Sequence, residues 1–251
     1  MKYENRIAQV DDLQKEINQY RPLKRNALKQ LKEYYRIVLI YSSNAIEGNS
    51  LTESETKVVI ENGITIGGKP LKDHYEAVGH SEAFDLLYML AKKKEITESA
   101  ILKLHRIFYY RIDSKNAGRY RREPVIITGA QVDLPSPGEI KTLMKKLDSE
   151  IPELREKHHP VEFASLLHIR IANIHPFIDG NGRTARLVMN LALLQEGYPV
   201  TVIPPVLRSD YMETLKESNK GNNQPFIHLI SCMVYESQKD YLRLLRNLEK
   251  E

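Results

Sequence analysis

The sequence has little of what marks a secreted, membrane-bound or nucleic-acid-binding protein. Its 251 residues include one cysteine, Cys232, so no internal disulfide can form and a reducing, cytoplasmic compartment is expected. The formal net charge of +4 is too mild to predict a nucleic-acid partner. The opening stretch is too polar for a signal peptide, and no apolar run approaches the roughly 18 residues of a membrane span. The length and composition therefore indicate a globular protein with one sizeable core, or a core plus a small extra lobe, and no membrane partner.

Most of the chain carries the periodicity of amphipathic helices. Thr52 and Glu55 form a capping box that begins one helix, and Gly63 ends it. Similar patterns predict helices at about 72–93, 97–111, 136 onward, 161–173, 183–196, 209–218 and 225–247, so we expect an all-α protein. Before residue 46, apolar or aromatic side chains recur every three or four positions: Ala27, Leu31, Tyr34, Val38, Tyr41 and Ala45.

One segment departs from this pattern. Residues 118–137 hold three consecutive β-branched residues, Val125, Ile126 and Ile127. Thr128 and a glycine follow as a turn signal, and Val132 continues the apolar pattern. The segment therefore predicts a short β-hairpin on an otherwise helical body.

A polar loop lies between two apolar segments, in the stretch IHPFIDGNGRTAR that ends at Arg186. Gly180 and Gly182 allow the backbone to approach a ligand closely. The helix that follows directs free N–H groups and its dipole at the loop, which makes an anion site. Arg183 and Arg186 lie on one side of the first helical turn and can clamp phosphate oxygens.

Two further side chains of this loop suit phosphate chemistry. Asp179 is a hard oxygen ligand for Mg²⁺ or Mn²⁺ on nucleotide phosphates. His175, with an intrinsic pKa of about 6.5, suits a general base near neutral pH. Taken singly, an Asp before Gly is usually a turn, and a lone His at a helix end is usually structural. Their concentration between two core-forming segments favours a nucleotide-binding site.

The run from His175 to Arg183 (HPFIDGNGR), followed by Thr184, Ala185 and Arg186, resembles the full signature of the Fic family. The resemblance covers about residues 35–235 and is greatest to FICD-type members. It implies an all-α Fic core with a β-hairpin flap, in which residues 51–251 form the catalytic core. It also implies transfer of AMP from ATP to a Ser, Thr or Tyr hydroxyl of a target protein.

The resemblance assigns roles within the loop. His175 would deprotonate the target hydroxyl, and Asp179 would hold the metal ion. A phosphorylating relative has Lys at the position of Gly182, so the glycine favours nucleotidyl transfer. The remaining signature residues would contact the phosphates: Gly180, Asn181, Arg183, Thr184, Ala185 and Arg186.

Two other regions would complete the site. The flap, residues 125–128, would pair with the target through main-chain bonds and cover the nucleoside. The alternative is a hairpin with a purely structural role. Tyr211 and Asn219 lie in the region that borders the adenine in the family, where Tyr can stack and Asn can bond the base edge.

An upstream stretch, SNAIEG, resembles the inhibitory motif of Fic proteins and comprises Ser43, Glu47 and Gly48. Its place in an N-terminal helical region, residues 1–50, would make this a class II, self-inhibited member. Glu47 should pair with Arg186 and so deny that arginine to the γ-phosphate. The alternative is that Glu47 merely ends a surface helix. The same carboxylate could also orient water that removes AMP from a modified target.

Three functions stay open at this point. The leading prediction is a self-inhibited protein adenylyltransferase. A related enzyme could transfer UMP or phosphocholine instead, and a non-enzymatic nucleotide-binding regulator could keep the fold. A homodimer is one expected assembly, and the target protein cannot be read from the chain.

Overall fold

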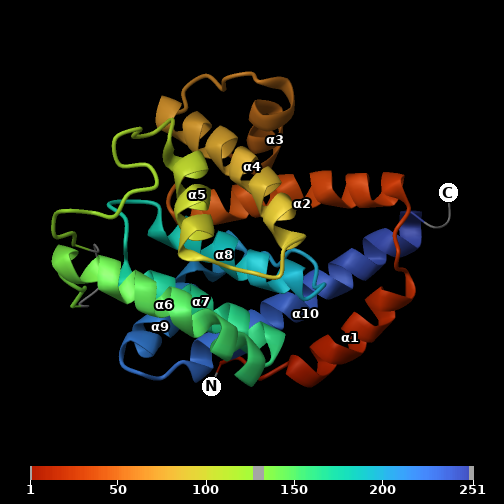
Figure 1. The fold of residues 1–251 in the computed structure, drawn as a ribbon. Helices are drawn as coiled ribbons and strands as arrows, with labels where there is room; N and C mark the ends of the chain where they lie inside the picture. Colours follow the sequence, from red (N-terminus) through yellow and green to blue (C-terminus); the bar gives the residue numbers. More distant parts are fainter. Residues whose placement is uncertain (1, 127–132, 249–251) are drawn as a thin grey trace.

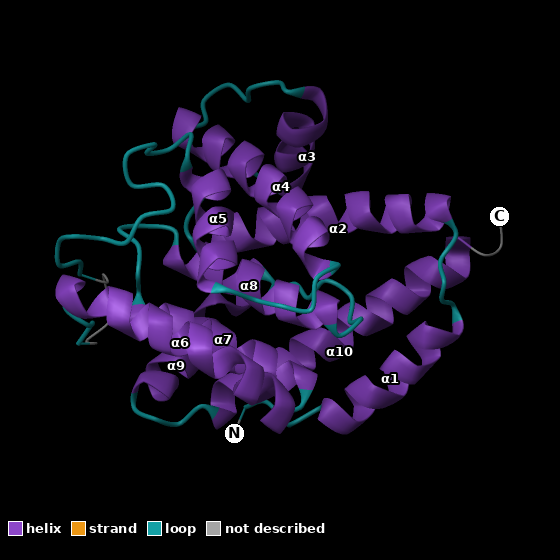
Figure 2. Cartoon of the chain, viewed as in Figure 1, coloured by secondary structure: helices purple, strands orange, loops and turns teal. Residues whose placement is uncertain are grey.

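The structure, a computed structural model, describes residues 2–126 and 133–248. Within these ranges it contains helices and loops and no strand (Figure 2), which confirms the prediction of an all-α protein. The helices are α1 (Ile7–Gln19), α2 (Arg25–Ile46), α3 (Glu53–Asn62), α4 (Leu71–Ala91), α5 (Glu98–Tyr109), α6 (Pro137–Lys157), α7 (Pro160–Ile174), α8 (Asn181–Gln195), α9 (Arg208–Asn219) and α10 (Gln224–Leu248), with a short 3₁₀ helix at Pro205–Leu207.

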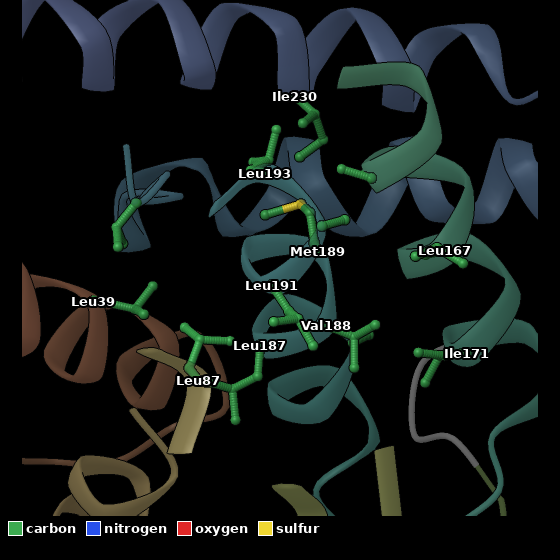
Figure 3. Packing of buried hydrophobic residues seen from close by; sticks show 14 of the residues in the cluster. Leu39, Leu87, Leu167, Ile171, Leu187, Val188, Met189, Leu191, Leu193 and Ile230 are labelled. Atoms are coloured by element: carbon green, nitrogen blue, oxygen red, sulfur yellow. The ribbon is translucent and has the colours of Figure 1, made fainter. Parts of the chain in front are cut away.

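Helix α8 lies at the centre of the core. It packs against α7, α4, α5 and α2 (Figure 1), and its residues from Asn181 to Leu193 are buried except for Gly182. Figure 3 shows Leu187, Val188 and Leu191 of α8 surrounded by side chains from neighbouring helices. The apolar side chains of α8 fill this interior, and the polar Arg183, Arg186 and Asn190 are buried with them. The first turn of α8 is therefore held by neighbouring helices.

The N-terminal helices belong to the same hydrophobic core. Val10 and Ile17 of α1 and Leu39 and Ile46 of α2 are buried within it. Helix α1 lies against α10, and α2 contacts α3, α4, α8 and α10. As a result, the C-terminal end of α2 lies next to the N-terminal end of α8.

The capping signals operate as the sequence predicts. Thr52 and Glu55 form a capping box at the start of α3, and Gly63 ends that helix in a left-handed conformation. Helix α8 begins at Asn181, two residues earlier than the predicted start at Arg183, because Gly180 already provides its left-handed N-cap.

The predicted hairpin does not appear in the described residues. Val125 and Ile126 form an irregular loop, as do residues 133–136, and Ile126 is 93% exposed. A strand needs a paired backbone, and this part of the segment has none. Ile127, Thr128 and Val132 lie outside the described residues.

In the part of the chain that the structure describes, no helix is both long enough and apolar enough to cross a membrane.

Candidate active site

The loop between α7 and α8 has an unusual backbone at both ends. His175, which follows α7, has φ of 50° and is the one described non-glycine residue with a positive φ. Gly180, which precedes α8, has φ of 77°. A Cβ at Gly180 would lie 2.8 Å from Cε1 of Phe108, so this position requires glycine.

Hydrogen bonds and one aromatic stack hold the loop in place. The side-chain oxygen of Asn181 accepts from the N–H of Phe177 at 2.9 Å, and its amide nitrogen donates to the Phe177 carbonyl at 2.8 Å. The Phe177 ring stacks on His105 with centroids 3.7 Å apart. Nδ1 of His105 accepts from the N–H of Gly118 at 2.9 Å, and Nε2 lies 3.1 Å from the carbonyl oxygen of Asp179. Asn181, predicted to bind phosphate, therefore also fastens the loop.

Burial keeps His105 neutral. Burial lowers the pKa of His105 to about 4, although the nearby Asp179 acts to raise that pKa. A neutral ring matches the observed bonds, since one nitrogen accepts and the other donates.

Arg186, in the first turns of α8, is 2% exposed and fully engaged. Its Nε donates to Oγ of Ser43 at 2.9 Å, and its Nη2 donates to the Ser43 carbonyl at 2.9 Å and to Oε1 of Glu47 at 2.7 Å. Its Nη1 donates to the Tyr211 hydroxyl at 3.0 Å, which in turn lies 2.9 Å from Nε2 of His168. The end of α2 thus supplies three acceptors to one guanidinium group.

Glu47 is charged in this setting. Burial alone raises the pKa of Glu47, but the neighbouring Arg186 and Arg183 outweigh burial and hold that pKa below its usual value. A Cβ at Gly182 would lie 2.3 Å from Oε1 of Glu47, so the glycine allows the carboxylate to approach the loop. Gly48 follows directly, just beyond the end of α2. Glu47 therefore does more than end a surface helix: it pairs with the second arginine of the loop.

Arg183 is equally buried but less well satisfied. Its Nη1 lies 2.6 Å from Oε1 of Glu76 on α4, and its guanidinium carbon lies 4.6 Å from the centre of the Phe108 ring. Among the described residues, Nε of Arg183 has no hydrogen-bond acceptor, and Nη2 donates to Oδ1 of Asp179 at 3.4 Å. Buried donors normally find acceptors, so this arginine is suited to an incoming anion.

Asp179 presents an ionised carboxylate at the surface of the site. Its side chain is 41% exposed. Oδ1 accepts from the N–H of Gly180 at 2.6 Å, and Oδ2 lies 3.5 Å from Nζ of Lys72. Burial raises its pKa, but Arg183, the Gly180 N–H and Lys72 outweigh this effect and lower it below its usual value.

Asp179 would be the main protein ligand of a metal ion here. The described residues contain no group of three or more His, Cys, Asp or Glu side chains that could hold a metal. One carboxylate nevertheless fits Mg²⁺ bound to a nucleotide, because that ion takes most of its ligands from phosphates and water.

His175 has the properties of a base. Burial lowers its pKa, and the positive charge of Arg121 lowers it further, while the Ala172 carbonyl, Glu47 and Asp179 act in the opposite direction. Nδ1 lies 3.4 Å from the carbonyl oxygen of Ala172. That contact favours a proton on Nδ1 and leaves Nε2 free to accept one.

A cavity of about 140 Å³ joins these elements. His175, Asn181 and Gly182 come from the loop and α8, Glu47 comes from α2, and Asn219 comes from α9. The remaining lining residues are Ala172, Asn173, Tyr211, Met212, Leu215 and Lys216.

The predicted site residues differ in how they lie relative to this cavity. Thr184 and Ala185 are fully buried inside α8, and neither side chain faces the cavity. Tyr211 lines the cavity, but it is buried and its hydroxyl bonds to Arg186. Asn219 is exposed at the end of α9.

Sequence reasoning missed several residues that shape the site. Glu76, His105 and His168 are buried polar side chains that contact Arg183, Asp179 and Tyr211, respectively. Arg121, in the loop after α5, is a further buried residue next to His175. For Glu76, His105 and His168 the available signal was a polar residue inside an otherwise apolar helical pattern, and Arg121 offered none.

Known proteins with this architecture identify the family. The Fic/DOC family model matches residues 95–193. A crystal structure of a Fic domain containing signaling protein from Bacteroides thetaiotaomicron has a TM-score of 0.86 and 31% identity, and the match covers 96% of this chain and 97% of that chain. The chain belongs to the Fic/DOC family. A structure of residues 134–508 of Fic-1 from C. elegans has a TM-score of 0.83 and 30% identity, over 94% of this Fic/DOC chain and 70% of that chain.

Longer relatives carry a named activity. "Protein adenylyltransferase Fic" of Drosophila willistoni is 36% identical over 228 residues, which are 90% of this chain and 45% of the relative. The protein of the same name from Drosophila ananassae is 38% identical over 218 residues, which are 86% of this chain and 44% of the relative. This Fic/DOC chain therefore spans a little under half the length of these relatives.

Proposed function

We propose that this Fic/DOC protein is a self-inhibited protein adenylyltransferase, which transfers AMP from ATP to a Ser, Thr or Tyr hydroxyl of a target protein. One observation carries the proposal: Glu47, which lines the same cavity as His175, is bound to the buried Arg186. The name of the Drosophila relatives supports the activity.

The phosphates of ATP would bind at the start of α8. Free N–H groups and the helix dipole favour anions there. Arg183 would supply its Nε, which has no acceptor among the described residues, and Arg186 would bind the γ-phosphate once Glu47 leaves. Asp179 would hold Mg²⁺ or Mn²⁺, an ion that supplies charge neutralisation at the phosphates.

His175 would act on the target hydroxyl. Its lowered pKa keeps the imidazole neutral at pH 7, so Nε2 can take the hydroxyl proton. The target oxygen then forms a bond to the α-phosphorus of ATP. The bond from that phosphorus to the bridging oxygen breaks, and pyrophosphate leaves.

Self-inhibition would follow from charge and space. The cavity of about 140 Å³ is smaller than the roughly 300–1,000 Å³ of typical small-ligand pockets. The Glu47 carboxylate both occupies Arg186 and places a negative charge where the γ-phosphate would bind. The same group could orient water that removes AMP from a modified target.

Other parts of the site belong to this proposal without direct observation. Residues 125–128 would pair with the target backbone as a flap. Asn219 would border the adenine, together with the face of Tyr211. Residues 1–50 would form the regulatory region and residues 51–251 the catalytic core. A cytoplasmic location and a homodimer are further predictions, which cell fractionation and sedimentation would test.

The test uses Glu47→Gly with Mg²⁺ and each of three labelled donors, ATP, UTP and CDP-choline. We expect protein-bound label from ATP alone, and only when the label is on the α-phosphate. Label from UTP or CDP-choline would replace the proposal with transfer of UMP or phosphocholine. ATP binding without any transfer would indicate a non-enzymatic regulator.

A further inference from the structure

One buried arginine outside the signature joins three separate backbone segments. Arg121 is 3% exposed. Its Nε donates to the carbonyl oxygen of His175 at 2.9 Å, and its backbone N–H donates to that of Pro176 at 2.9 Å. Its Nη1 donates to the Glu123 carbonyl at 3.2 Å and its Nη2 to the Pro135 carbonyl at 2.6 Å. All these acceptors are backbone oxygens, so the contacts fix the path of the chain.

Arg121 contacts the loop at His175, which has the most restricted backbone conformation of the loop. His175 has φ of 50°, a conformation that is unfavourable for a residue with a Cβ. Such a conformation persists where surrounding contacts determine it. The N–H of His175 donates to the Ile171 carbonyl at 2.9 Å, and Arg121 holds the carbonyls of His175 and Pro176. The Arg121 side chain thus provides one bond to the backbone of the proposed base, and the Arg121 backbone N–H provides a second bond, to the next residue.

We propose that Arg121 is a positioning residue for AMP transfer, which holds His175 in its left-handed conformation and fixes it relative to residues 123 and 135. The kinetic test of this inference depends on the proposed function, because it measures AMP transfer. Lysine could not replace this residue, because one ammonium group cannot reach carbonyls in three directions as a planar guanidinium can.

Arg121 also affects His175 through its charge. The charged groups that face His175 are Arg121, which lowers its pKa, and Glu47 and Asp179, which raise it. Loss of the Arg121 charge should therefore raise the pKa of His175. AMP transfer slows at low pH where His175 becomes protonated, and this acid limb of the plot of rate against pH should then move to higher pH.

The experiment compares Arg121→Met, Arg121→Lys and Arg119→Met, each added to Glu47→Gly. Arg119 is an exposed neighbour, so its variant controls for the loss of one positive charge. A misplacement of about 1 Å can cost about 100-fold in rate. We expect Arg121→Met to lower kcat by about 10- to 100-fold, to leave ATP affinity within about twofold, and to shift the acid limb upward.

The lysine variant separates geometry from charge. Arg121→Lys should lower kcat in the same range but leave the acid limb in place, because it keeps the charge. Equal kcat values for Arg121→Met, Arg121→Lys and Arg119→Met would overturn the inference. If Arg121→Met does not fold, an unchanged kcat in Arg121→Lys would be enough to reject it.

A second measurement does not require activity. NMR titration of the His175 ring in Arg121→Met should give a higher pKa than in Arg119→Met. Equal pKa values together with unchanged backbone chemical shifts of His175 would contradict the inference, even if Glu47→Gly transfers no AMP, which is the outcome that would reject the proposed function.

Discussion

Replacing Glu47 by glycine should tighten ATP binding by an amount that the structure allows us to estimate. Oε1 of Glu47 lies 2.7 Å from Nη2 of Arg186. A hydrogen bond to a charged group is worth about 1.5–3 kcal/mol. The Glu47 side chain is 35% exposed, so we reduce this to about 1–2 kcal/mol for solvent screening. If the contact must break before the γ-phosphate binds, its removal should lower the Kd for ATP by about 5- to 30-fold.

Calorimetry with ATP and with AMP tests this reasoning. The gain should be present for ATP and small for AMP, because only ATP carries the phosphate that competes for Arg186. Glu47→Gln should give an intermediate gain, since a neutral amide can still accept from the arginine. Glu53→Gln, an exposed change in the first turn of α3, should bind ATP as the wild type does. An unchanged ATP affinity in Glu47→Gly, or an equal gain for AMP, would refute the argument.

Three further outcomes are expected. Added to Glu47→Gly, His175→Ala should abolish AMP transfer and leave ATP binding by calorimetry nearly unchanged, because the base acts on the target hydroxyl; preserved transfer would exclude that role. In the same background Asp179→Ala should leave transfer low at saturating ATP, and so should EDTA added to Glu47→Gly alone; undiminished labelling in EDTA would show that no metal is needed. The pKa of His105 falls from 6.5 to about 4 on folding. Its contribution to the free energy of unfolding, about 3 kcal/mol, is thus complete above pH 6.5 and is lost as pH falls toward 4. Urea unfolding across this range should show a weaker pH dependence in His105→Gln than in the wild type.

Local signals made much of the fold predictable. Thr52, Glu55 and Gly63 mark the ends of α3 through bonds between near neighbours. The loop after α7 could likewise be recognised, because its glycines, carboxylate and arginines follow one another in the chain. Glu47 and Arg186 were expected to meet because each lies in a recognisable motif.

Contacts that depend on the assembled fold could not be predicted from the sequence. Glu76 and Arg121 bind partners far along the chain, Arg183 and the His175 carbonyl. Nothing in the residues around them specifies these partners. Tyr211 is predicted to border the adenine, which stays a prediction; its burial and its bond to Arg186 depend on how α8 and α9 pack and could not be read from the sequence.

The central claim is that Glu47 blocks AMP transfer by holding Arg186. The most direct test measures transfer of α-phosphate-labelled ATP to protein by the wild type, by Glu47→Gly, and by Glu47→Gly combined with Arg186→Ala. The account predicts low labelling for the wild type, strong labelling for the single variant, and loss of that gain in the double variant, since the freed arginine brings about the gain. Equal labelling by the single and double variants would contradict the claimed pair, and equal labelling by the wild type and Glu47→Gly would contradict self-inhibition itself.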